Sequence, residues 1–435
     1  MNRFLAVVAT WLMVLVALAQ GGPGGPGGGG QPTLSLVGSS TNWTGNSPAT
    51  NRFLFPAQLP SIEGFTHPVV YTKGGSAQLQ VFFQNNNPQQ DFVGNLIVQD
   101  ARFIHSTPPA VGTPGSPPPV TIPDTILSAP TVSLSVPIGQ TSPASLSLGG
   151  LPSFVTHGYI QLTMRVEGNF GAQVPGGNPS PWSGTVNTQK VYITLSNPVG
   201  VMNPIWTEVA EISCSFAQQS STLASVNQKL SQGLFDSNLM LYNLSSGAQG
   251  QFLMLSSGNP AESVYLLKNF LNQYVAAGRQ MVNCYDINGF LIILHECQGI
   301  DSVGQKVNEV GEPLFVTNPV CPIGYNRADA SYYFRLPFSN HFQCIVSGTL
   351  SDSALAYSHD LSGVVRMDVA WAWSVTGAWQ TFSIPNVYGL TYRLKLAEDT
   401  IAAVQGMPLT VVIVGPTPAQ SVGRQATTID VTSVN

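Results

Sequence analysis

Alternating hydrophobic and polar positions dominate the first half of the chain. Every second residue is hydrophobic in 77–83 and 160–166, and 191–195 repeats the pattern. Period-two alternation buries one face of a strand and leaves the other in solvent, as in a sandwich of antiparallel sheets. Proline- and glycine-rich segments at 108–119 and 175–181 separate these runs and predict loops. We therefore expect an all-β sandwich in this half.

The hydrophobic period becomes helical after about residue 204. The spacing predicts four helices, near 209–216, near 226–230, from Pro260 to before Gly278, and from Asn283 or Cys284 to Gln298. The last of them should end at Gly299 and bury the face that carries Ile287, Leu291 and Leu294.

Strands are expected again after the fourth helix. A long loop over 301–337 comes first, and the best strand candidates follow at 341–346 and 364–373. Helices followed by an antiparallel sheet are the order of an α+β domain.

The first residues have the three-part layout of a secretory signal peptide. A positive start at Arg3 precedes an apolar run over 4–18, and Ala17-Leu18-Ala19 forms a small-residue cleavage site. This run of about 15 residues is short for a transmembrane helix, which needs roughly 20. Export is therefore predicted, to the medium, the cell surface or the periplasm, with no transmembrane segment after signal removal.

These patterns divide the chain into four parts. We expect a signal peptide at 1–19, a Gly/Pro linker at 20–32, an immunoglobulin-like β-sandwich at 33–200 and an α+β domain at 201–435.

The charge of the chain argues against nucleic acid as a partner. Only 9% of residues are charged, and the 21 acidic residues outnumber the 16 lysines and arginines. Nucleic-acid binding requires clustered basic residues, which this chain lacks.

The cysteines indicate where chemistry is possible. All five lie in the second half, at Cys214, Cys284, Cys297, Cys321 and Cys344. An odd number leaves at least one thiol without an intrachain disulfide, and no CxxC pair suggests a zinc ribbon. One unpaired thiol in an exported chain is consistent with a nucleophile.

Cys284 has the best local setting for a nucleophile. Asn283 can cap the helix that begins here, and Asp286 can complete a capping box. A cysteine on the first turn of a helix lies where the helix dipole favours negative charge, and the thiolate is the reactive form.

A histidine and an aspartate follow in catalytic order. His341 lies at the start of a predicted strand, and Asp360 follows 19 residues later. A carboxylate on a neighbouring strand can fix the tautomer of the imidazole and stabilise its charged form. Asp352 and Asp368 lie in the same window, and His359 is an alternative base, so the choice of acid and base stays open.

Three short stretches resemble the transglutaminase-like superfamily of papain-fold cysteine enzymes. They are 282–286 around Cys284, 340–342 around His341, and 359–360. The segments that begin at Pro204 and Phe382 also look like bacterial members, so the resemblance covers about 204–400. It departs from the family at His359, where an aromatic residue is usual.

The resemblance implies a Cys284–His341–Asp360 triad that acts on peptide or amide bonds. The thiol would attack, the imidazole would act as base and then acid, and the backbone N–H of Cys284 would bind the oxyanion with a side-chain donor such as Gln280. The implied substrate is a protein, a peptide or a cell-surface polymer, with no cofactor and no metal. Hydrolysis and crosslinking both remain open, with hydrolysis favoured.

The sequence also bears on two other classes of protein. His295-Glu296 begins like a zinc-protease motif, but Gly299 stands where the second histidine is needed. A non-catalytic surface or structural protein that retains the fold is the main rival, because the His359-Asp360 pair is irregular and the surroundings of Cys284 are ordinary.

Overall fold

A computed structural model describes most of the two predicted domains. The described residues are 34–42, 52–53, 69–106, 122–171, 182–188, 190–202, 205–237, 239–244, 251–255, 262–277, 280–309, 315–316, 320–326, 329–332, 337–338, 341–347, 349–358, 366–367, 373–374 and 424–434. The predicted signal peptide and linker lie outside them. No helix within these ranges is both long and apolar enough to cross a membrane.

The N-terminal half forms two sheets around one core. The first has the order β2-β1-β4-β8, from strands Arg52–Phe53, Leu34–Asn42, Ser76–Asn85 and Thr141–Gly149. The second has the order β3-β11-β9-β5-β6, from Val69–Thr72, Val191–Thr194, Thr156–Phe170, Phe92–His105 and Thr125–Ile126, with β10 (Trp182–Asn187) on β9 and β7 (Val132–Val136) on β5. Buried residues of both sheets belong to a single hydrophobic cluster. The immunoglobulin-like type stays a prediction.

The alternation in the sequence matches the burial in these strands. Strand β4 alternates strictly between buried and half-buried residues, and the hydrophobic positions of β9 over 160–166 all face the core. Strand β11 differs, because all four of its residues are buried. Val191 and Ile193 belong to the core of the sheets, whereas Tyr192 faces the helices of the second half.

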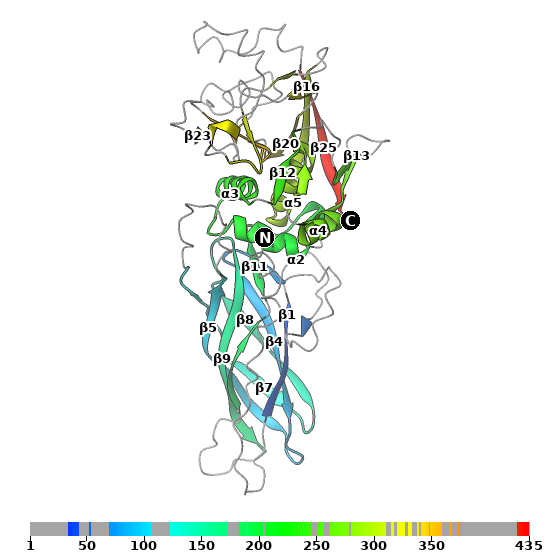
Figure 1. Cartoon of the computed structure of the whole chain (residues 1–435). Helices are drawn as coiled ribbons and strands as arrows, with labels where there is room; N and C mark the ends of the chain where they lie inside the picture. The colour runs from blue at the N-terminus through cyan, green and yellow to red at the C-terminus, as the bar shows by residue number, and fades with distance from the viewer. Residues whose placement is uncertain are drawn as a thin grey trace.

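The C-terminal half combines helices with a mixed sheet. The helices are α2 (Thr207–Phe216), α3 (Leu223–Asp236), α4 (Leu267–Ala277) and α5 (Cys284–Cys297). The main sheet has the order β13-β14-β25-β16-β20-β21-β24, from Leu253–Leu255, Glu262–Tyr265, Arg424–Val434, Ser302–Glu309, His341–Val346, Thr349–Ser351 and Trp373–Ser374. Helices α2 and α3 lie between this sheet and the strands of the N-terminal half (Figure 1).

Short strands complete this half of the molecule. Strand β12 (Met240–Tyr242) pairs in parallel with β15 (Gln280–Val282), β17 (Phe315–Val316) pairs with β19 (Pro337–Phe338), and β22 (Leu355–Ser358) pairs with both β18 (Val320–Pro322) and β23 (Arg366–Met367). The described residues also include 3-10 turns at Gly200–Met202 and Ala330–Tyr332.

Two predictions from the sequence were wrong. The third helix does not begin at Pro260, because residues 262–265 form β14 and pair with β25 and β13. The stretch 301–337 is not one loop, because it contains β16, which pairs with β20 and with β25. In both cases the partner strand β25 is more than 100 residues away, so local patterning could not reveal the pairing.

Helix α5 is the centre of the C-terminal half. The predicted face of Ile287, Leu291 and Leu294 is buried, but so is almost every other residue of this helix. It contacts α2, α3, β16 and β20, which together surround it. Gly299 ends the helix with a φ of +72° as predicted, a conformation that favours glycine.

The C-terminal end of α5 is bonded to the segment that links the two halves. Backbone N–H groups of Ser196 and Val199 donate to the carbonyls of Gln298 and Glu296 at 3.0 Å each, and the N–H of Val201 donates to the Glu296 carboxylate at 2.9 Å. The helix that begins at Cys284 is therefore fixed at its far end to the end of the N-terminal half.

Candidate functional site

Cys284 is the first residue of α5, as predicted. The Asn283 side chain accepts hydrogen bonds from the N–H groups of Tyr285 and Asp286 at 2.9 and 3.2 Å. The Asp286 carboxylate accepts a hydrogen bond from the Asn283 N–H at 3.3 Å, and this bond completes the predicted capping box. The cysteine is therefore held at a well-formed helix N-terminus.

Asp286 also fixes the chain that passes in front of this helix. Its buried carboxylate accepts the N–H groups of Gln251, Phe252 and Leu253 at 2.7–3.0 Å. Burial raises the pKa of Asp286, although these backbone bonds favour the ionised form. The residue anchors strand β13 beside the start of α5.

His341 is the first residue of β20, and its ring lies between an acid and the thiol. Its Nε2 bonds to Asp352 Oδ2 at 2.8 Å, and the Cys284 side chain lies close enough to the ring to raise its pKa. Burial alone would lower the pKa of His341, but the Asp352 charge and the bonds to Asp352 and Cys284 raise it to about 10. With Nε2 occupied by the acid, Nδ1 is the nitrogen that can exchange a proton with the thiol.

The acid that reaches His341 is Asp352. This residue follows β21 and is 1% exposed. Its other oxygen, Oδ1, accepts bonds from the Ala354 N–H at 2.8 Å and from Asn288 Nδ2 at 3.0 Å. Asp360, Asp368 and His359 lie outside the described residues. Asp352 was recognised in the sequence only as an alternative, because nothing local separates it from the other two aspartates.

Tyr242 is a neighbour of the thiol that the sequence did not indicate. It ends β12 opposite Val282, and its hydroxyl lies close enough to the side chain and the backbone of Cys284 for both to shift its pKa. Burial and the nearby Cys284 and Asp352 charges keep its pKa well above the ordinary value, so its hydroxyl stays protonated.

Gln280, the donor suggested by the sequence, begins β15 opposite Met240. The Gln280–Met240 pair lies two residues before the Val282–Tyr242 pair on these strands. A tyrosine on a three-residue strand carries no sequence signal that would have selected it.

The remaining thiols are buried in the core. All five cysteines are thiols, and Cys284 is 4% exposed whereas the others are 0% exposed. Burial raises the pKa of Cys344, whose Sγ lies 3.9 Å from His295 Nδ1. His295 in turn bonds to Asn227 at 2.8 Å, and burial lowers its pKa to about 3. In the described ranges no three His, Cys, Asp or Glu side chains are placed to hold a metal ion.

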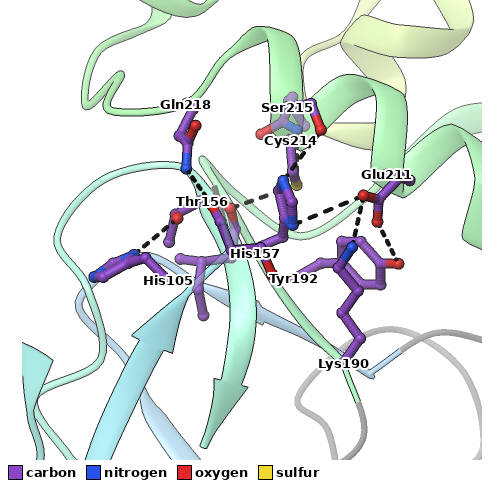
Figure 2. Close-up of polar contacts among 12 residues, drawn as sticks. His105, Thr156, His157, Lys190, Tyr192, Glu211, Cys214, Ser215 and Gln218 are labelled. Carbon is purple, nitrogen blue, oxygen red and sulfur yellow. Dashed lines mark hydrogen bonds and ion pairs between the residues drawn. The ribbon is translucent and has the colours of Figure 1, made fainter. Parts of the chain in front are cut away.

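A second row of hydroxyl, imidazole and carboxylate lies where the two halves meet (Figure 2). His157 of β9 bonds through Nε2 to Ser215 Oγ of α2 at 3.1 Å, and its Nδ1 lies 3.9 Å from Glu211 Oε1. Glu211 instead binds Lys190 Nζ at 2.6 Å and the Tyr192 hydroxyl at 2.9 Å.

The electrostatics of this second row differ from those at Cys284. Burial lowers the pKa of His157 to about 4, because the Glu211 charge only partly offsets it and Lys190 opposes protonation. Lys190 and His157 in turn outweigh burial and lower the pKa of Glu211. A carboxylate 3.9 Å from the ring and already paired with a lysine does not orient an imidazole as a base. We interpret this row as a structural contact between β9, β11 and α2.

Comparisons with known proteins find only distant likenesses. No protein-family model matches the chain, and no curated protein matches it. Among solved structures, red sea bream transglutaminase has a TM-score of 0.29 and 8% identity over 66% of this chain and 46% of that one. A candidate protease from Parabacteroides distasonis has a TM-score of 0.19 and 10% identity over 69% of each chain, and a family 123 glycoside hydrolase from Clostridium perfringens has 0.16 and 9% over 48% and 40%.

The alignment spans less than half of the red sea bream enzyme. The likenesses to a transglutaminase and to a candidate protease are distant. At TM-scores this low they carry no argument about activity.

Proposed function

We propose that the protein is an exported cysteine hydrolase or acyltransferase that acts on peptide or amide bonds through Cys284, His341 and Asp352. The observation that carries the proposal is the buried His341 ring, which bonds to the Asp352 carboxylate and has the Cys284 side chain close enough to raise its pKa. Three residues from α5, β20 and the turn after β21 meet there, although 68 positions separate the first from the last. A nucleophile, a base and a group that orients the base are the three roles that nucleophilic catalysis requires.

The first step follows from the positions of these groups. The Cys284 sulfur attacks the carbonyl carbon of the substrate as a thiolate, because a His341 ring with a pKa of about 10 already carries the proton at neutral pH. Asp352 accepts the Nε2 hydrogen and stabilises the charged imidazole, which is consistent with the raised pKa of His341. The imidazolium then protonates the leaving amine and a thioester remains. Water releases an acid from this thioester, and an amine would give a crosslink.

The oxyanion formed by the attack has two suitable donors. The backbone N–H of Cys284 lies on the first turn of α5, and the Tyr242 hydroxyl lies close to the side chain and the backbone of Cys284. Hydrogen-bond donors directed at the developing oxyanion are the usual means of stabilising a tetrahedral intermediate. We assign the second donor to Tyr242 rather than to Gln280.

The wider assignment rests on the sequence. Export follows from the predicted signal peptide, and the N-terminal half would act as a spacer or adhesion module. The substrate would be a protein, a peptide or a cell-surface polymer. Hydrolysis is the favoured outcome.

Thiol labelling and turnover test the proposal together. Iodoacetamide should modify Cys284 much faster than the four fully buried thiols. Cleavage of a synthetic peptide library, read by mass spectrometry with and without an added primary amine, should disappear in Cys284→Ala. Cys344→Ala is the matched control, because Cys344 also contacts a buried histidine. Equal labelling of all five thiols, or turnover that survives in Cys284→Ala, would favour the non-catalytic rival.

A further inference from the structure

One buried amide joins all three parts of the candidate site. Asn288 lies one helical turn after Cys284 on α5 and is 0% exposed. Its Nδ2 donates to the Phe342 carbonyl at 2.6 Å and to Asp352 Oδ1 at 3.0 Å, while its Oδ1 accepts the Ser353 N–H at 3.1 Å. Both amide hydrogens and the carbonyl oxygen are therefore used.

Each of these bonds fixes a different element relative to the thiol. Phe342 follows His341 on β20. The bond from Asn288 to the Phe342 carbonyl therefore fixes the position of His341 along the axis of α5. The other two hold the turn that carries Asp352. With Oδ1 bound by Asn288 and Ala354, Oδ2 is directed at His341.

The turn around Asp352 has a second attachment that does not touch the carboxylate. Ser353 Oγ donates to the Ser231 carbonyl of α3 at 3.0 Å, and Ser351 bonds to the Ser231 hydroxyl. The contacts of Ser351 and Ser353 with Ser231 thus hold the turn in place independently of Asn288. Asp352 Oδ1 itself is bound by the Ala354 N–H and by Asn288, and of these only the bond from Asn288 comes from a side chain and from helix α5.

We infer that Asn288 is a positioning residue that aligns the acid and the histidine strand with the nucleophile helix. This inference rests on the proposed function, because it concerns the same thiol, imidazole and carboxylate. Asn288 touches no reacting atom and acts through Asp352 and the backbone of β20.

Replacement of Asn288 by leucine tests this role without a substrate. In full-length Asn288→Leu we expect the pKa of His341, measured by NMR, to fall by about one unit, and the alkylation rate of Cys284 by iodoacetamide at neutral pH to fall about tenfold. Asn227→Leu is the matched control, because Asn227 is equally buried but bonds to His295. It should lower the melting temperature and leave both quantities unchanged.

The substitution Asn288→Asp keeps the shape of the side chain if leucine prevents folding. The introduced carboxyl must remain protonated to donate to Asp352, so its pKa should rise by several units. A carboxyl that titrates normally there, or a His341 pKa that is unchanged in Asn288→Leu, would overturn the inference. Failure of the proposed function looks different, because wild-type Cys284 would then be no more reactive than the other thiols.

Discussion

Two buried histidines in this protein stand between a nucleophilic side chain and a carboxylate, and they behave in opposite ways. His341 contacts Cys284 and Asp352, and its pKa is raised to about 10. His157 contacts Ser215 and lies near Glu211, and its pKa is lowered to about 4. Both rings are at most 1% exposed, so burial disfavours the charged form in both.

The difference lies in what each carboxylate binds. Asp352 Oδ2 is 2.8 Å from its ring, and the bonds to Oδ1 come from an amide and a backbone N–H. Glu211 Oε1 is 3.9 Å from its ring and is bonded to Lys190, whose charge opposes protonation of His157. A row of suitable residue types is therefore not a catalytic site unless the acid is directed at the ring and is not already neutralised.

Neutralising the two acids should separate the two rows most clearly. Asp352→Asn should lower kcat by about 10³-fold, because the imidazole loses the charge that fixes its tautomer. Glu211→Gln should leave kcat within about twofold and cost about 1 kcal/mol of stability through the lost lysine pair. Steady-state kinetics and thermal melts of both variants check this. Similar losses of kcat in the two would remove the distinction.

The two histidines should limit stability at opposite ends of the pH range. His157 is neutral when folded, so its contribution is present above about pH 6.5 and is lost as pH falls towards 4, with a size of up to about 3 kcal/mol. His341 has a raised pKa, so its contribution is present below about pH 6.5 and is lost as pH rises through about 10.

Denaturant unfolding at several pH values measures both limits. In His157→Gln the free energy of unfolding should fall less between about pH 6.5 and pH 4 than in the wild type, and its decrease at alkaline pH should be unchanged. If the loss of stability at acid pH is the same in this variant as in the wild type, His157 is not its cause.

Removing the hydroxyls of Tyr242 and Tyr192 should give the smallest difference between the two rows. Tyr242→Phe should lower kcat by about 10²-fold with little change in KM, because the hydroxyl would stabilise the oxyanion of the transition state and not the bound substrate. Tyr192→Phe removes the bond to Glu211 and should cost about 1 kcal/mol of stability without affecting kcat. A large rise in KM for Tyr242→Phe, with kcat unchanged, would place its hydroxyl in substrate binding instead.

Local patterns in the sequence predicted the elements that local forces determine. The alternation in β4 and β9, the Asn283 cap of α5 and the start of β20 at His341 all follow from neighbouring residues. The start of α4 and the strand β16 were missed, because their pairing partner β25 comes from the end of the chain. The alternating pattern of strand β11 predicts one buried face, but both of its faces are buried, because helices cover the second face.

The sequence by itself determined which cysteine opens a helix and which histidine opens a strand, because capping and periodicity depend on residues close along the chain. Only the tertiary structure decided which aspartate meets the imidazole, which hydroxyl reaches the thiol, and that Asn288 joins them. Those choices depend on distances between residues far apart in the chain, and on whether a carboxylate already has a partner. The same physical reason separates the candidate site from the junction that resembles it.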